Sequence, residues 1–197
     1  MTAQNQASGV AHSEFAPRIF ERPAHRYCAL AAHCRRDELG AKVPALLHEL
    51  LAWFERHGVT PSGAQLVRYL VVDYNTGSLN IEVGVPLETD KCPTDARIQW
   101  REIPAGRYVT LTHAGPYTYL VDTTASLLDW ARRNRVVLDV DDHEKVTQWG
   151  CRVERYLVAP PHEMQPERWI TEIAIRLSDR VGIEPKPAIS RAAPNRW

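Results

Sequence analysis

Arg68-Tyr69-Leu70-Val71 recurs letter for letter as Arg155-Tyr156-Leu157-Val158 in the second half of the chain. Three further matches keep the same order: Tyr27-x-x-Leu30 with Tyr108-x-x-Leu111, Leu50-Leu51-Ala52-Trp53 with Leu127-Leu128-Asp129-Trp130, and Ile81-Glu82-Val83-Gly84-Val85 with Thr171-Glu172-Ile173-Ala174-Ile175. One short match can arise by chance in a chain rich in Arg, Leu and Val, but an ordered series is hard to obtain that way. The sequence therefore predicts an internal duplication.

The hydrophobic period of the first copy predicts a strand, a helix and two further strands, in that order. The expected strands cover residues 26–34, 65–73 and 79–87. The helix is expected from an apolar stripe at Val43, Leu46, Leu47, Leu50, Leu51 and Phe54. Pro44 suits the first turn of this helix, and Gly58 suits the position just beyond its end.

The second copy repeats this order, with expected strands at residues 107–113, 147–158 and 169–177. Its helical stripe is Leu120, Val121, Thr124, Leu127, Leu128 and Ala131. Residues 88–99 and 136–145 are expected to be loops. The predicted fold class is α+β: a duplicated strand-helix-strand-strand unit with pseudo-twofold symmetry, antiparallel sheets and two main helices. One such unit leaves apolar surface uncovered, so the copies should bury it on each other, with a ligand cleft at their seam.

Composition favours one globular domain. The chain has 197 residues, of which 44% are hydrophobic and 24% charged, with 24 basic and 24 acidic residues. No basic stripe indicates a nucleic-acid partner, and neither a signal peptide nor a long apolar segment indicates a membrane, so a cytoplasmic location is expected. Residues 1–16 are expected to be a disordered tail, 17–178 a single domain with repeats at about 20–90 and 100–178, and 179–197 a flexible tail.

No metal and no cofactor are expected. The four cysteines, Cys28, Cys34, Cys92 and Cys151, form no C-x-x-C pair, which argues for reduced thiols rather than a zinc site. The histidines show no ligand spacing, and His113 is expected to form structural hydrogen bonds at a turn. The chain also lacks a glycine-rich phosphate loop and a G-x-S-x-G motif.

A family resemblance rests mainly on the second half of the chain. The segments that carry it are Ile103-Pro104-Ala105-Gly106-Arg107-Tyr108, His113-Ala114-Gly115-Pro116-Tyr117, Trp130, Glu154-x-Tyr156 and Thr171-Glu172-Ile173. They resemble the GyrI-like small-molecule-binding domain, which is also the effector-binding domain of some AraC- and MerR-type transcription regulators. In the first half the resemblance rests on element order and Val83-Gly84-Val85-Pro86, and altogether it covers about residues 20–178.

The resemblance implies two strand-helix-strand-strand units around an aromatic-lined cleft, in which an acidic residue receives hydrophobic cations and other amphipathic drugs. With no room for a helix-turn-helix outside about residues 20–178, a stand-alone binding domain is expected. The candidate ligand-binding residues are Glu154, Tyr156, Tyr117, Trp130, Trp149 and Trp169. Glu154 is the acid that the motif implies, and Val67 occupies its place in the first copy, which predicts an asymmetric cleft.

The residues themselves leave alternatives open for this site. On a strand, Glu154 shares one face with Arg152 and Tyr156, where rings and a carboxylate together attract a cation. The alternative is a solvated glutamate at an edge, or one that pairs with Arg152 or Arg155. The candidate aromatic residues are equally consistent with ordinary packing.

Three functions follow from these expectations. The first is a cytoplasmic sensor or sequestering protein that binds a small amphipathic compound, aromatic or cationic, between the repeats. The second is enzymatic, because some stand-alone proteins of this resemblance are hydrolases that open cyclopropane rings of DNA-alkylating natural products; Glu154 would then activate water, assisted by the hydroxyl of Tyr156 or Tyr117. The third is binding to gyrase, which the neutral charge and the lack of an acidic DNA-mimicking surface disfavour.

Overall fold

A computed structural model describes residues 16–88 and 96–179 of the chain. Its two α-helices are α1 (Leu39–Arg56) and α2 (Leu120–Arg133), and short 3-10 helices cover Arg36–Glu38, Tyr117–Tyr119 and Pro166–Arg168. The strands are β1 (Arg18–Arg22), β2 (His25–Arg35), β3 (Leu66–Asp73), β4 (Ser78–Pro86), β5 (Ile98–Ile103), β6 (Gly106–Ala114), β7 (Val140–His143), β8 (Val146–Val158) and β9 (Ile170–Arg176). Cys92 and nearly all of both expected tails lie outside the described residues.

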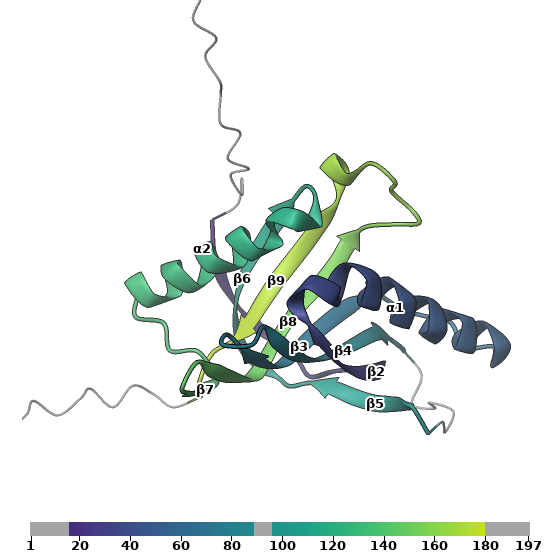
Figure 1. Cartoon of the computed structure of the whole chain (residues 1–197), viewed down its shortest axis with the longest axis horizontal. Helices are drawn as coiled ribbons and strands as arrows, with labels where there is room; N and C mark the ends of the chain where they lie inside the picture. Colours follow the sequence, from purple (N-terminus) through teal and green to yellow (C-terminus); the bar gives the residue numbers. More distant parts are fainter. Residues whose placement is uncertain (1–15, 89–95, 180–197) are drawn as a thin grey trace, which may run out of the picture.

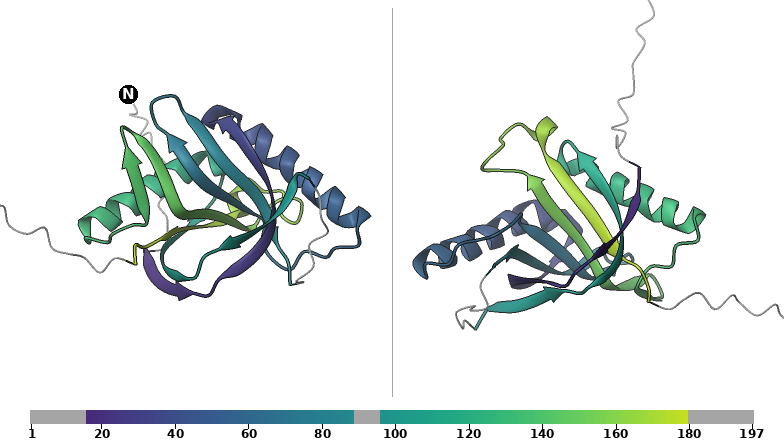
Figure 2. Two further views of the ribbon diagram at one scale, coloured as in Figure 1. Left: turned by 90° about the horizontal axis from the view of Figure 1, so that it is seen from below. Right: turned by 180° about the vertical axis from the view of Figure 1, so that it is seen from behind.

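The described strands form one antiparallel sheet in the order β1-β6-β9-β8-β3-β4-β2-β5, with β7 paired to β8. The sheet is strongly curled (Figure 2). The predicted α+β class, the antiparallel pairing and the two main helices are confirmed. The expectation of separate sheets is wrong, because β3 pairs directly with β8 and thereby joins the strands of both halves.

Some elements differ from the prediction. The edge strands β1 and β5 were not expected, and β7 lies within the predicted loop at residues 136–145. Helix α1 begins at Leu39, so Pro44 lies inside the helix rather than in its first turn. Just before the helix, the backbone N–H of Arg35 donates to the Glu38 carboxylate at 2.7 Å. Val121 is 53% exposed and does not belong to the buried stripe of α2. Gly58 follows the end of α1 with a φ of 63°, a conformation that favours glycine.

The two helices lie apart over one face of the sheet (Figure 1). Helix α1 contacts β2 and β4, whereas α2 contacts β6. Strands β9, β8 and β3 pass between them in Figure 1. The central strands are therefore the part of this face where side chains of both halves of the chain meet.

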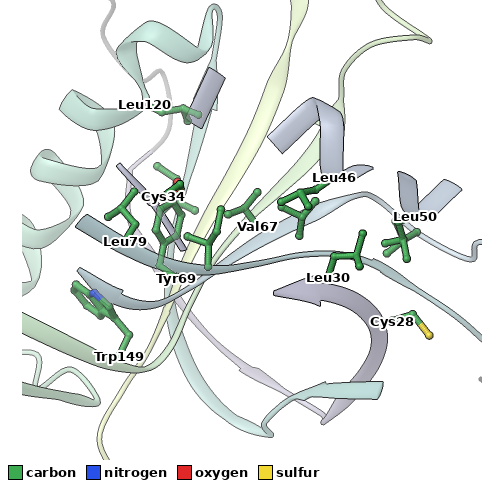
Figure 3. Close-up of a cluster of buried hydrophobic side chains, with 14 of the residues drawn as sticks. Cys28, Leu30, Cys34, Leu46, Leu50, Val67, Tyr69, Leu79, Leu120 and Trp149 are labelled. Atoms are coloured by element: carbon green, nitrogen blue, oxygen red, sulfur yellow. The ribbon is translucent and has the colours of Figure 1, made fainter. Parts of the chain in front are cut away.

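The main core lies on the helix-covered face. Figure 3 shows Val67 and Tyr69 of β3 in the same cluster of buried side chains as Leu46 and Leu50 of α1 and Leu120 of α2. A second, smaller cluster contains Tyr27, Ala29, Leu66, Ile103, Tyr108, Cys151, Val153 and Ala174. Strand residues alternate between the two clusters, as expected for a sheet with side chains packed on both faces. None of the helices in the described part of the chain combines the length and apolar character needed to cross a membrane.

Candidate functional site

Glu154 interrupts a row of apolar side chains that runs across the sheet. Residues paired directly on neighbouring antiparallel strands point to the same face. Followed through the pairings, the row is Leu111, Ile173, Glu154, Val67, Val83, Leu30 and Ile98. Every member is buried, with 5% exposure or less. A single carboxylate thus lies at the centre of the helix-covered face, with apolar residues on both sides in the row.

The Glu154 side chain is held by two tyrosine hydroxyls. Tyr69 donates to its Oε2 atom at 3.1 Å and Tyr156 donates to the same atom at 3.3 Å. Burial raises the pKa of the Glu154 carboxyl above its ordinary value, and this effect exceeds the opposing influence of Arg152 and of the two hydroxyls. The carboxyl therefore resists ionisation in the absence of a further positive charge.

Two of the alternatives for Glu154 are now decided. The residue is 3% exposed, so the interpretation as a solvated edge glutamate is wrong. Of the two arginines considered, Arg152 approaches it, with Nη2 3.6 Å from Oε1, whereas Arg155 pairs with Glu172 at 3.3 Å. Val153 belongs to the cluster on the opposite face, as the alternation along the strand predicted.

Tyr69 is the site residue that the sequence interpretation missed. It pairs with Arg152 across β3 and β8, which brings its hydroxyl to Glu154. Burial and the neighbouring Glu154 raise the pKa of Tyr69 well above its ordinary value, so the hydroxyl stays protonated and donates. A signal was present, because Tyr69 and Tyr156 occupy the same position in the repeated Arg-Tyr-Leu-Val segment.

Arg152 lies among aromatic rings on the same face. Its guanidinium carbon is 4.3 Å from the ring centroid of Tyr69 and 5.4 Å from that of Trp149. Trp149 is buried and pairs with Val140 of the unpredicted strand β7. Within the described residues, the Nε atom of Arg152 and the indole Nε1 of Trp149 are buried without a hydrogen-bond partner. Buried polar groups without a partner are uncommon in protein interiors, so the surroundings of Arg152 and Trp149 require an explanation.

Three aromatic rings, each in contact with the next, lead away from Glu154 on the side opposite Arg152. Tyr156 meets Tyr117 edge-on at 5.2 Å between centroids, and Tyr117 stacks on Trp169 at 4.2 Å. All three residues are half-buried. Burial raises the pKa of Tyr117 to about 12. The indole N–H of Trp169 donates to the carbonyl of Glu163 at 2.9 Å, and this hydrogen bond fixes the ring to the segment that precedes β9.

The turn before α2 positions Tyr117. His113 is buried, with Nε2 3.0 Å from the carbonyl oxygen of Pro116 and Nδ1 2.8 Å from the hydroxyl of Thr123. The Gly115 N–H donates to the carbonyl of Trp169 at 2.9 Å, and its φ of 118° lies in a region that favours glycine. The structural hydrogen-bonding role predicted for His113 is therefore confirmed.

The structure brings together five of the predicted site residues but not the sixth. Glu154, Tyr156, Tyr117, Trp149 and Trp169 belong to one connected group that also contains Tyr69 and Arg152. Trp130 lies on α2, half-buried against the main core, and no described ring contact or hydrogen bond joins its side chain to this group. The ligand-binding roles of all six residues remain predictions.

A buried carboxyl between tyrosine hydroxyls and aromatic rings can bind a cation, accept a neutral donor or hold a proton. Among the residues that the structure describes, no three His, Cys, Asp or Glu side chains lie together as metal ligands do. The groups that the described residues bring together here are one acid, one arginine and the surrounding rings.

Comparison with known sequences identifies a family. A sequence model described as GyrI-like small molecule binding domain matches residues 15–178. No curated protein matches the chain.

Solved structures share the fold. The C-terminal domain of EcmrR has a TM-score of 0.67 at 19% identity, over 84% of this chain and 98% of that domain. In the cryo-EM structure of the EcmrR–DNA complex, also with a TM-score of 0.67 at 19% identity, the match covers 82% of this chain and only 57% of the longer EcmrR chain. SAV2435 bound to tetraphenylphosphonium has a TM-score of 0.60 at 9% identity, over 84% and 95% of the two chains. A hydrolase from Listeria innocua has a TM-score of 0.53 at 14% identity, over 82% and 91%. At these identities the similarity shows the fold alone.

Proposed function

Because the chain belongs to the GyrI-like small molecule binding domain family, we propose that it binds an amphipathic aromatic cation around Glu154 and thereby senses or sequesters that compound. The proposed site is the helix-covered face of β3 and β8. Its acid is Glu154, and its rings are those of Tyr69, Tyr156 and Trp149, with Tyr117 and Trp169 beyond them.

The observation that carries this proposal is the position of Glu154 in the apolar row. Removing a carboxylate from water is unfavourable unless hydrogen bonds or an opposite charge compensate. Here two hydroxyls and Arg152, at 3.6 Å, compensate only in part, since burial still raises the pKa of Glu154. A titratable group held in this condition is a candidate for function, and an organic cation is the guest that most directly offsets its desolvation.

The rings supply the rest of the binding energy. Aromatic faces attract cations, and stacking of rings adds affinity for a planar or multi-ring guest. Glu154 is enclosed in the empty protein, so a guest reaches it only if side chains shift. The half-buried group of Tyr156, Tyr117 and Trp169 extends from Glu154 toward the surface, and we assign the entrance to it. Tetraphenylphosphonium bound to SAV2435, which shares the fold, supports a guest of this class.

The internal duplication is part of this proposal. Cross-strand pairs of the first half have counterparts in the second half. The pair Leu66–Gly84 corresponds to Val153–Ala174, and the pair Leu30–Val83 corresponds to Leu111–Ile173. These are the pairs that the matched sequence segments predict, which supports a common origin of the halves. Val67 lies directly opposite Glu154, so the position at which the copies differ lies where they meet.

We expect tetraphenylphosphonium to bind with micromolar or tighter affinity at about pH 8 and at least about tenfold more weakly at about pH 5. The reason is that burial raises the pKa of Glu154, so its charge is lost at a higher pH than for an exposed glutamate. Isothermal titration across this pH range measures the effect. Tetraphenylborate, which has the same shape and the opposite charge, is the control and should show no such gain with pH. An affinity for the phosphonium that does not change with pH would contradict a role for the Glu154 charge.

A second function is favoured by the same raised pKa. A carboxyl whose pKa is raised by burial, with the hydroxyls of Tyr156 and Tyr69 beside it, is suited to activating water, and a Listeria innocua hydrolase shares the fold. Glu154 would act as the base and Tyr156 as the hydrogen-bonding partner in opening a cyclopropane ring. Incubation with a spirocyclopropane model compound, followed by mass spectrometry, distinguishes the two functions. Ring-opened product that requires Glu154 supports the enzyme, and unchanged compound at stoichiometric protein excludes it for this substrate class.

A further inference from the structure

We propose that Arg152 is an internal occupant of the cation site, so that its guanidinium holds the place beside Glu154 until an external cation displaces it. This inference rests on the proposed function and extends it, because it names the residue that sets how strongly the site selects for positive charge.

The geometry around Arg152 is that of a bound cation. Its guanidinium lies over the ring of Tyr69 at 4.3 Å and near that of Trp149 at 5.4 Å, both within the distance at which a cation and an aromatic face attract each other. Glu154 is the acid that pairs with it, with Nη2 and Oε1 3.6 Å apart. A carboxylate and two rings are what the proposed cationic guest requires. Here they already surround a cation, the guanidinium of Arg152, which lies on the same strand two residues from Glu154.

The hold on Arg152 is weak in comparison with other arginines of the fold. The 3.6 Å separation from Glu154 exceeds hydrogen-bond length, and within the described residues its Nε atom has no partner. The Nε atom of Arg68 on the opposite face likewise has no partner among the described residues, but its Nη1 and Nη2 atoms donate to the carbonyl oxygens of Glu102 and Gly150 at 2.9 and 3.0 Å. The indole N–H of Trp149 is also buried and unsatisfied. Arg152 therefore fills the site without completing its hydrogen bonds, as a displaceable group does.

Displacement has a consequence for specificity. With Arg152 in place, the charges of Arg152 and Glu154 balance, and a cationic guest gains little from the acid. Only when the long arginine side chain moves aside does Glu154 attract the guest at full strength. Replacing Arg152 by an uncharged residue of similar length should therefore favour cations and disfavour anions.

The test is isothermal titration of Arg152→Met with tetraphenylphosphonium and with tetraphenylborate at about pH 8. We expect the variant to bind the phosphonium at least about tenfold more tightly than the unmodified protein, and the borate no more tightly. The control is Arg155→Met, because Arg155 lies on the same strand but pairs with Glu172 on the other face. Its affinities for both ions should stay within about threefold of the original values, a limit set by the size of ordinary surface effects.

Each result decides a different claim. Equal phosphonium affinity of Arg152→Met and the unmodified protein, or a weaker one for the variant, overturns the role of Arg152 and leaves the proposed function standing. Failure of all three proteins to bind either ion overturns the proposed function, and this inference with it. If Arg152→Met does not fold, Arg152→Lys replaces it, since lysine keeps the charge but lacks the planar group that lies on the rings. That variant should gain at least about threefold for the phosphonium, and no gain contradicts the proposal.

Discussion

Glu154→Gln is expected to weaken tetraphenylphosphonium binding by at least about tenfold at about pH 8, because the glutamine keeps the size of the side chain and removes its charge. Isothermal titration gives the affinity. The same variant should not be less stable than the unmodified protein. A raised carboxyl pKa stabilises the fold below the pKa of the unfolded chain, and this stabilisation is lost as pH rises through the folded-state pKa. Glutamine undergoes no such loss.

Stability and binding together make this test specific. At neutral pH, thermal unfolding of Glu154→Gln should begin at an equal or higher temperature than that of the unmodified protein, while the affinity falls. The matched control is Glu102→Gln, because Glu102 is exposed and lies 4.0 Å from Arg26 in a loose pair. Its affinity should not change. Weaker binding by Glu154→Gln that is accompanied by a large loss of stability would instead assign Glu154 a structural role.

Glu82→Gln is expected to behave in the opposite way and to lower the free energy of unfolding by about 3 kcal/mol. Glu82 is 2% exposed and accepts hydrogen bonds from Arg101 Nε at 2.5 Å and from the hydroxyl of Tyr27. Arg68 adds a third contact at 4.0 Å. Removing the charge leaves buried donors and an arginine without their acceptor. The loss should lie at the low end of the range for buried pairs, since the half-exposed Arg101 can turn to water.

Denaturant unfolding monitored by tryptophan fluorescence measures this loss. Glu102→Gln again serves as the control and should change the unfolding free energy by no more than about 0.5 kcal/mol, as an exposed pair does. The affinity of Glu82→Gln for tetraphenylphosphonium should remain unchanged under conditions in which it is folded. A change below about 1 kcal/mol for Glu82→Gln would show that its ion pairs contribute little to the fold.

The contrast between the two acids matches their positions in the repeat. Glu82 corresponds to Glu172 in the other copy, and Glu172 is likewise paired, with Arg22 at 2.6 Å and Arg155 at 3.3 Å. Burial tends to raise the pKa of Glu172, but these arginines outweigh it and lower that pKa, the reverse of Glu154. An acid in both copies thus completes the fold, whereas the acid in only one copy marks the candidate site.

The sequence predicted the main elements because their apolar patterns are strong. Strands β2, β3, β4, β6, β8 and β9 and both helices lie where the patterns placed them. Strand β1 was missed because Arg18–Arg22 contains only two apolar residues, Ile19 and Phe20, and both are exposed at the sheet edge. Strand β7 was missed for a related reason, since Val140 is the one apolar residue of Val140–His143, and this short strand is defined by its pairing with β8.

The site was predicted in part. Glu154 and its neighbours along β8 could be placed on one face from the alternation of a single strand. Tyr69 could not, because its approach to Glu154 depends on which strand lies beside β8, and the pairing of β3 with β8 joins segments more than seventy residues apart. The distinction between packing and binding roles for tryptophans likewise depends on neighbours from other elements, as Trp149 and Trp130 illustrate.

The central claim, that a cationic guest binds at Glu154 on the helix-covered face, is tested most directly by intermolecular nuclear Overhauser effects. They should join the phenyl protons of bound tetraphenylphosphonium to the rings of Tyr69, Tyr156 and Trp149. Overhauser effects only to Tyr27 and Tyr108, which belong to the cluster on the opposite face, would contradict it.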